Sequence, residues 1–318
     1  MTQLSPIRMA DRLPRTVTPS VRMLALASLI SQILIVVTGG AVRLTASGLG
    51  CPEWPRCTAD SMVTTAEMGI HGVIEFGNRL LTFVLTAIAV AMLVSLWNMR
   101  KTRRDLFVPA VVLLAGIPAQ AVVGGITVLT QLNPWVVGWH FIISMILIAV
   151  ATVLVNRTRL SAAEAAAETQ PRAARILRQL LVIAAVLVTI AVLLGVVVTG
   201  SGPHAGDAGA ARNNLNPDLM TRIHAAPVYL LVLTVLVLVV AAYRLNVAQR
   251  LRGALVMLTV VVFAQGAIGY LQHFLHLPVA LVALHMLGAS VLTAAMAHAL
   301  YVGFTRRRVD SVTRTSGK

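Results

Sequence analysis

Four histidines each stand a few residues inside the start of a long apolar segment, and they are His71, His140, His224 and His285. The interval from His71 to His224 is close to that from His140 to His285, so the histidines recur in two matching parts of the chain. An imidazole inside a bilayer is costly unless it has a function. Two imidazoles on facing helices can ligate a haem iron from both sides, whereas zinc wants three or four close ligands. The pattern favours two bis-histidine haem sites.

Further polar residues accompany only the first pair. Glu75 lies one helical turn after His71, Asn78 lies a further turn along the same face, and Arg79 is on the adjoining flank. Two interpretations of Glu75 stay open. It could form an ion pair with Arg79 that braces the end of the helix, or it could lie beside a haem edge and accept a proton or stabilise positive charge. The matching stretch of the second part holds no carboxylate, so the two sites have diverged.

Cys51 and Cys57 are the only cysteines, and they share one loop with two prolines between them. The spacing does not fit a CxxC-type metal site, and there is no second pair. We interpret the two thiols as an oxidisable pair on the outer side of the membrane. The pair either staples the loop or has a redox role, and the sequence leaves both open.

Arginines near the histidines are candidates for holding haem propionates, because a guanidinium group pairs with a carboxylate in a two-pronged geometry. Snorkelling of the side chain to the membrane surface explains each equally well. These candidates are Arg43, Arg79 and Arg222. The remaining histidines are interpreted as structural or solvated, and they are His204, His273, His276 and His298.

The elements that must position these residues are membrane-spanning helices. Hydrophobic residues make up 58% of the 318 residues and charged residues only 12%, which excludes an ordinary soluble domain. A spanning helix needs about 17–25 apolar residues, and backbone groups in lipid must be paired within the helix. Segments of this length are predicted at 22–43, 70–97, 106–129, 136–156, 176–199, 219–243, 252–271 and 278–304.

The net charge of +15 comes from basic residues that gather in alternate loops and at both ends of the chain. The positive-inside rule therefore predicts a multi-pass protein of the cell membrane with both termini in the cytoplasm. The basic excess is topological and argues against nucleic-acid binding. The first apolar run is of spanning length with no small-residue cleavage site after it, so we expect it to stay in the protein.

Short stretches of the two parts resemble one another. VVTGGAVRLT at 36–45 matches VVTGSGPHAG at 197–206, and QAVVGGITVL at 120–129 matches QGAIGYLQHF at 265–274. The sequence thus predicts an all-α membrane protein of eight helices in two pseudo-symmetric four-helix bundles. The predicted divisions are a cytoplasmic tail at 1–21, one bundle at 22–160, a linker at 161–175, a second bundle at 176–304 and a tail at 305–318.

The run TGGAVRLTASGLGCPEWPRC at 38–57, followed by IEFGNRL at 74–80 and LHM at 284–286, resembles the haem A synthases, in a form that looks actinobacterial. The resemblance covers about residues 22–304. It implies a membrane oxidoreductase that converts haem O to haem A by oxidising the C8 methyl group to a formyl group through hydroxylated intermediates. It also implies haem O synthase and the cytochrome oxidase assembly machinery as partners.

By this resemblance the N-terminal bundle holds the substrate haem O and the C-terminal bundle holds haem B. His224 and His285 are then the axial ligands of haem B, and His140 is one ligand of the substrate. Glu75 matches the essential glutamate of the family, and Cys51 and Cys57 match its cysteine pair. Many members carry a histidine where this chain has Asn78. His71, one turn earlier, could take that role.

Two other functions would use the same histidines. A di-haem cytochrome b that relays electrons from quinol explains the four imidazoles but gives Glu75 and the cysteines no role. A transporter built from parallel repeats could line a proton path with histidines. Contacts with membrane lipid are expected in every case, and the sequence leaves a homo-oligomer open.

Overall fold

The structure is a computed structural model that describes residues 13–160, 175–203 and 209–304. Eight long helices span most of these residues, and no strand occurs in these ranges. In chain order they are α1 (Pro19–Leu44), α2 (Gly69–Ser95), α3 (Arg104–Leu129), α4 (Pro134–Arg157), α6 (Arg175–Ser201), α7 (Pro217–Arg244), α8 (Gln249–Phe274) and α9 (Val279–Phe304). All eight are long and apolar enough to cross a membrane, so the prediction of eight spanning helices is confirmed.

Several helices begin a few residues before the predicted spans because polar caps precede the apolar runs. Thr18 accepts a hydrogen bond from the backbone N–H of Val21, and a proline opens α1. Asn133 and Asn216 cap α4 and α7 in the same way, each followed by a proline. A side-chain acceptor followed by proline is a strong start signal for a helix. Hydropathy alone cannot detect this signal, since the capping residues are polar.

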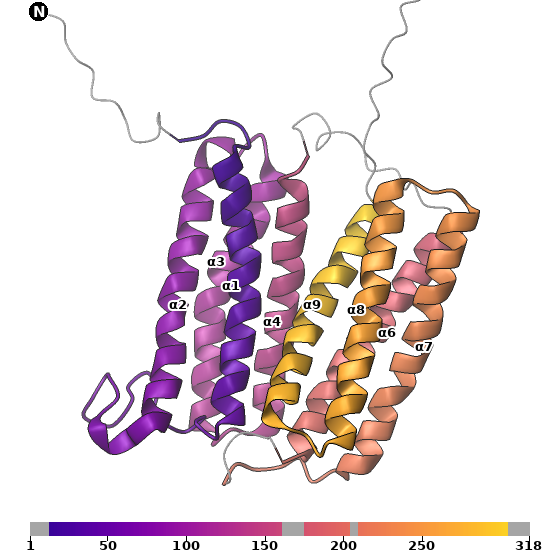
Figure 1. Ribbon diagram of the computed structural model, residues 1–318. Helices are drawn as coiled ribbons and strands as arrows, with labels where there is room; N and C mark the ends of the chain where they lie inside the picture. The colour runs from indigo at the N-terminus through magenta and orange to yellow at the C-terminus, as the bar shows by residue number, and fades with distance from the viewer. Residues whose placement is uncertain (1–12, 161–174, 204–208, 305–318) are drawn as a thin grey trace, which may run out of the picture.

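The helices pack in two groups that follow the order of the chain (Figure 1). In the first group α1 contacts α2 and α4, and α3 contacts α2 and α4. In the second group α6 contacts α7 and α9, and α8 contacts α7 and α9. The groups meet where α1 and α4 face α9 and where α4 faces α6. The order of contacts is the same in both groups, as a duplication requires. A symmetry axis that relates them stays a prediction, as do the domain divisions.

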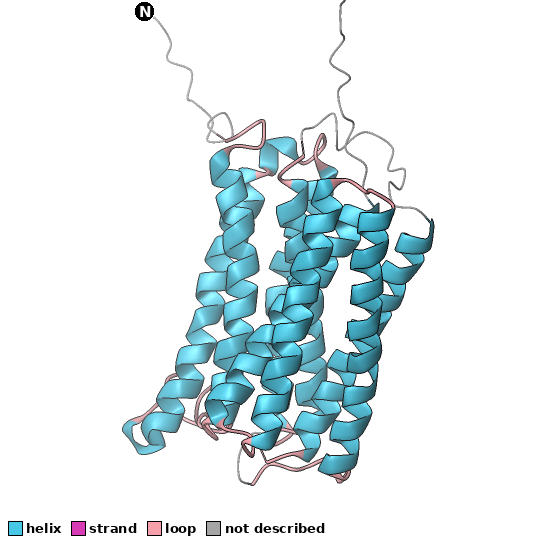
Figure 2. Ribbon diagram, turned by 45° about the vertical axis from the view of Figure 1, so that its right-hand side comes forward, coloured by secondary structure: helices cyan, strands magenta, loops and turns pink. Residues whose placement is uncertain are grey.

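The helices run side by side along one common direction (Figure 2), so alternate helices begin at the same end. We call this end, where α2, α4, α7 and α9 begin, the histidine end. It is at the bottom of Figure 1 and carries the loop of residues 45–65 between α1 and α2. Its placement on the outer side of a membrane stays a prediction. The predicted linker and C-terminal tail lie outside the described residues, apart from Arg175, which begins α6.

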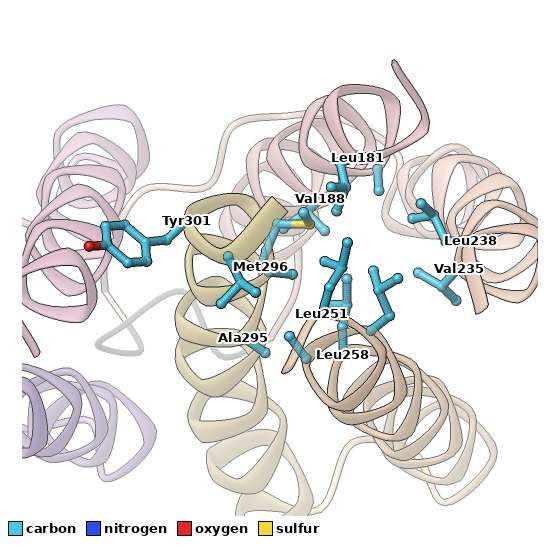
Figure 3. Packing of buried hydrophobic residues seen from close by; sticks show 14 of the residues in the cluster. Leu181, Val188, Val235, Leu238, Leu251, Leu258, Ala295, Met296 and Tyr301 are labelled. Carbon is cyan, nitrogen blue, oxygen red and sulfur yellow. The ribbon is translucent and has the colours of Figure 1, made fainter. Parts of the chain in front are cut away.

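Each group has a buried core cluster in the part of its helices away from the histidine end. In the second group this cluster includes Leu181, Leu238 and Leu258, each 0% exposed (Figure 3). In the first group it lies around Met92 and Leu154. Nothing is buried on α2 between Glu75 and Ala89, whereas α7 has Leu231 and Val235 buried near its middle.

Polar contacts join the helices at the end opposite the histidines. Arg103 is buried and pairs with both carboxylate oxygens of Asp105 at 3.0 Å, while it also donates to the Arg157 carbonyl. Oδ1 of Asn156 on α4 accepts a 2.8 Å hydrogen bond from Nδ1 of His298 on α9. His298 is therefore a structural residue that links the two groups.

We expect Leu238→Ala to lower stability by about 2–4 kcal/mol, because it leaves a cavity in the packed core of the second group. Val240→Ala removes a side chain that is 57% exposed on the same helix, and it should change stability little. Thermal unfolding in detergent compares the two. Equal melting temperatures for both variants would contradict the packing described for this core.

Candidate functional site

His285 lies in α9 with its ring against Gly269 of α8. A Cβ atom added to Gly269 would stand 3.2 Å from Cε1 of His285, which is tighter than ordinary van der Waals contact. Gln265, one turn before Gly269, donates from Nε2 to the carbonyl oxygen of His285 at 2.8 Å. The glycine makes room for the imidazole, and the glutamine fixes the backbone that carries it.

His140 in α4 has the same surroundings on α3. A Cβ atom added to Gly124 would lie 3.3 Å from Cε1 of His140. Gln120 donates from Nε2 to the carbonyl oxygen of His140 at 3.0 Å and to Oγ of Ser144 at 2.5 Å. The two histidine seats are therefore built from the same three residue types at the same helical spacing.

His224 in α7 rests on the glycine of a different helix. A Cβ atom added to Gly195 of α6 would lie 3.3 Å from Cε1 of His224. The Nδ1 atom of His224 is buried and has no hydrogen-bond partner among the described residues. His224 on α7 and His285 on α9 both belong to the second group.

His71 differs from the other three. Its side chain is exposed, and its Nδ1 lies 2.9 Å from the hydroxyl of Ser47 in the loop after α1. The repeat places Leu34 of α1 where His224 has Gly195, and no glycine of the described residues lies against the ring of His71. Ser47 is fully buried, which ties the histidine to a fixed part of the loop. His71 is thus positioned by a hydrogen bond rather than by packing.

The histidines fit a site in which two imidazoles bind one iron better than a site that needs three or more protein ligands. Among the described residues, no group of three or more His, Cys, Asp or Glu side chains could hold a metal ion. The Nδ1 atoms of His140 and His285 are buried and have no hydrogen-bond partner in the described part of the chain. Leaving a buried polar atom unpaired costs about 1–3 kcal/mol. These are not ordinary satisfied core histidines, and their chemistry fits a haem held between two imidazoles.

Glu75 is 6% exposed and has a partner on each carboxylate oxygen. Its Oε1 accepts a hydrogen bond from Arg79 at 2.6 Å, and its Oε2 accepts one from the backbone N–H of Cys51 at 2.6 Å. The ion pair foreseen with Arg79 is present. It joins α2 to the loop rather than bracing the helix alone, and it holds the carboxylate in one orientation.

Arg79 is the main anchor of this loop. Besides Glu75, its guanidinium group donates to the carbonyl oxygens of Cys51, Glu53 and Arg56 at 3.0–3.2 Å. A haem propionate would have to compete with these acceptors. The role of Arg79 as a propionate partner stays a prediction, whereas its role in shaping the loop is visible.

Cys51 and Cys57 form a disulfide, and both are fully buried. Within the loop that it closes, Trp54 packs against the backbone of α3 at Gly125, where a side chain would collide with the indole ring. The loop is therefore fastened to α2 by Arg79 and to α3 by Trp54. It covers the histidine end of the first group.

The other predicted residues lie apart from one another. Asn78 faces Gly39 of α1, and its buried Oδ1 has no hydrogen-bond partner among the described residues. Arg43 donates from Nη2 to the carbonyl oxygen of Thr199 at 3.0 Å, which joins α1 to α6. Arg222 is exposed near the start of α7. Neither arginine is excluded as a propionate partner, and both assignments stay predictions.

Sequence reasoning missed the glutamines and glycines that seat the histidines. The signal was present, because QAVVGGITVL and QGAIGYLQHF share a glutamine and, one turn later, a glycine. A glycine inside an apolar helix usually marks a close approach by another group. We read these stretches as evidence of duplication and did not ask what each shared residue contacts.

The fold and the site define a class: a multi-pass helical membrane protein with four histidines toward one end of its helices. The chain belongs to the COX15-CtaA family of cytochrome oxidase assembly proteins, whose family model matches residues 22–297.

Individual relatives match over shorter stretches. The chain is 30% identical over 131 residues to the haem A synthase of Lysinibacillus sphaericus, covering 41% of this chain and 42% of that protein. It is 29% identical over 133 residues to that of Bacillus pumilus, covering 40% and 41%. It is 31% identical over 114 residues to that of Listeria monocytogenes, covering 35% and 37%. The chain thus spans about two fifths of the length of the curated relatives it matches.

We expect Gly269→Val to abolish most haem binding in the second group, because the added side chain displaces the ring of His285. Gly266→Val, three residues earlier on the same helix, is the matched control, since a Cβ atom there meets nothing within 4 Å. The absorbance of purified protein in the Soret region, with extracted haem B quantified by chromatography, measures the effect. Equal haem B in both variants would rule out this seat for a ligand histidine.

Proposed function

We propose that this protein is a haem A synthase, which oxidises the C8 methyl group of haem O to the formyl group of haem A through hydroxylated intermediates. Family membership supports the general class, and the position of Glu75 supports the activity. The glutamate lies on the helix of His71 in the first group, buried and held at both oxygens. The second group has Val228 at the matching position. The first group thus has a carboxylate beside its histidines that could take part in a reaction, whereas the second group has only histidines that could ligate a haem.

In this proposal His71 and His140 hold haem O in the first group, with Asn78 beside it, and His224 and His285 hold haem B in the second. When bound, the haem iron supplies the oxidising chemistry. The residues of the chain orient the substrate and manage protons. Glu75 is acceptor-only while ionised, and Arg79 with the Cys51 N–H keeps it so oriented. A carboxylate in this position can accept a proton from a hydroxylated carbon or from water.

The loop that carries the disulfide has a role in the same proposal. Trp54 and Arg79 fasten it across the histidine end of the first group, where it limits the access of bulk water to Glu75. A site with little water strengthens electrostatic interactions and suppresses side reactions. In this proposal the disulfide between Cys51 and Cys57 has a structural role, because it holds the shape of the loop that shields Glu75 from water.

The remaining assignments of the proposal concern the cell. The distribution of basic residues supports cytoplasmic termini and an outward histidine end. A haem O synthase supplies the substrate, and assembly of cytochrome oxidase consumes the product. The actinobacterial form of the family and a homo-oligomer stay predictions.

Expression with a source of haem O, followed by extraction and chromatography of the haems, tests the activity. We expect haem A or its hydroxylated precursor above an empty-vector control. Glu75→Gln should lower the yield on the order of a hundredfold, because general acid–base groups contribute about that much. Glu53→Gln, an exposed carboxylate of the same loop, is the matched control.

Three outcomes would contradict this function. Absence of any haem product from the wild-type protein would reject the synthase. Bound haems with no product, unaltered in Glu75→Gln, would favour a cytochrome b that relays electrons. Purified protein with no Soret absorbance would favour a transporter.

Removal of individual histidines tests the assignment of the two sites. We expect His71→Ala to lose haem from the first group and to keep haem B, and His224→Ala to do the reverse, because the ligands come from separate groups. Haem content by type, measured after purification, distinguishes the sites. Unchanged haem O in His71→Ala would mean that His71 is not an axial ligand. The iron would then be five-coordinate or ligated by Asn78.

A further inference from the structure

An open groove of about 490 Å³ lies between α2 and α3 in the first group. Thr82 and Thr86 line it from α2, and aliphatic residues that include Ala115, Ile117 and Pro118 line it from α3. The hydroxyl of Thr86 donates to the carbonyl oxygen of Thr82 at 2.8 Å, so it needs no partner from a ligand. The wall is almost entirely apolar. We call this groove the α2–α3 pocket.

The pocket has a cause in the sequence. Pro118 stands inside α3, where it cannot donate a hydrogen bond to the carbonyl of Leu114. The repeat places Phe263 at this position of α8, which contains no proline. Leu114 and Pro118 both line the pocket. The pocket therefore lies beside the turn of α3 that lacks this backbone hydrogen bond, and the smaller proline ring stands where α8 has a phenylalanine.

The second group is filled at the corresponding place. The repeat aligns Asn78 and Thr82 of α2 with Leu231 and Val235 of α7, and both of the latter are 1% exposed in the buried cluster. Thr82 and Asn78 are only partly buried in the first group, so the aligned pair of the second group is packed more tightly. The difference matches the different ligands proposed for the two groups.

The pocket continues from the candidate reaction site. Glu75, Asn78, Thr82 and Thr86 follow the spacing of one face of α2, so the pocket begins about one turn beyond Asn78. On the side of the bilayer, its lining residue Val111 is 40% exposed. The pocket thus lies on the same face of α2 as Glu75, about two turns further along the helix, and it is open on the side of the exposed Val111.

We propose that the α2–α3 pocket receives the farnesyl chain of the substrate haem O. The inference rests on the proposed function, and it adds the part of the substrate that the histidines and Glu75 do not contact. The volume falls in the range of about 300–1,000 Å³ that is usual for small-molecule sites. Haem B lacks this chain, so a group that holds haem B needs no such space, and the second group has it filled.

The farnesyl chain would also fix the orientation of the porphyrin. A porphyrin between two imidazoles can rotate about the axis through the iron, and the histidines alone do not select which edge faces Glu75. The farnesyl group of haem O is attached to the pyrrole next to the one that carries the C8 methyl group. Seating the chain between α2 and α3 therefore restricts the rotation. Binding energy from a remote part of the substrate is then used to position the reacting carbon.

Filling the pocket tests this inference. Full-length Ala115→Phe and Thr82→Phe proteins are reconstituted in nanodiscs and titrated with haem O and, separately, with haem B, with resident haem B in the second group as a measure of intact folding. We expect the dissociation constant for haem O to rise about tenfold or more. Haem B binding to the first group should change less than twofold. Val112→Phe adds a ring at a position 41% exposed on α3 that does not line the pocket, and it should resemble wild type.

Wild-type affinity for haem O in both filled variants would overturn the inference and leave the pocket to lipid acyl chains. An equal loss of affinity for haem O and for haem B would overturn it too, since the filled pocket would then disturb binding of the porphyrin rather than of the farnesyl chain. The yield of haem A from the same wild-type preparation separates this test from that of the proposed function. A wild-type protein that makes haem A, together with a filled variant that makes as much, rejects the inference alone.

Discussion

The cost of placing polar groups among apolar helices governs this structure. In hydrocarbon a backbone or side-chain polar atom must find its partner inside the protein. Glu75 is paired at both oxygens, and Gln120 and Gln265 each donate to the backbone of a histidine-bearing helix. The rings of His140, His224 and His285 each lack a partner for a buried Nδ1 among the described residues. Such imidazoles are not held by ordinary hydrogen bonds of a protein core, which fits a role as ligands.

Small residues make those places possible. Helices that approach closely do so at glycine, and here three glycines each admit the ring of a histidine from the neighbouring helix. The two groups share this arrangement at His140 and His285, whereas His71 has no such glycine contact. Both groups have a buried core away from the histidine end, and the first is open between α2 and α3. The surroundings of His140 and His285 are therefore alike, and those of His71 and His224 differ.

Much of the fold could be predicted because spanning length and hydropathy depend on local sequence alone. The duplication and the level of the four histidines followed from spacing. The partners of these residues could not be predicted in the same way. Arg79 binds three carbonyl groups of a loop about 25 residues away in the sequence, and the pocket is lined by residues of two different helices. Such contacts depend on tertiary packing, which residue types do not encode singly.

A structure of the haem-loaded protein in a lipid nanodisc tests the central claim most directly. Our account predicts one iron between Nε2 of His224 and Nε2 of His285 in the second group. It also predicts a second haem in the first group, ligated by His140 and lying beside Glu75. Haem bound elsewhere, or imidazoles of the two groups joined to a single iron, would contradict it.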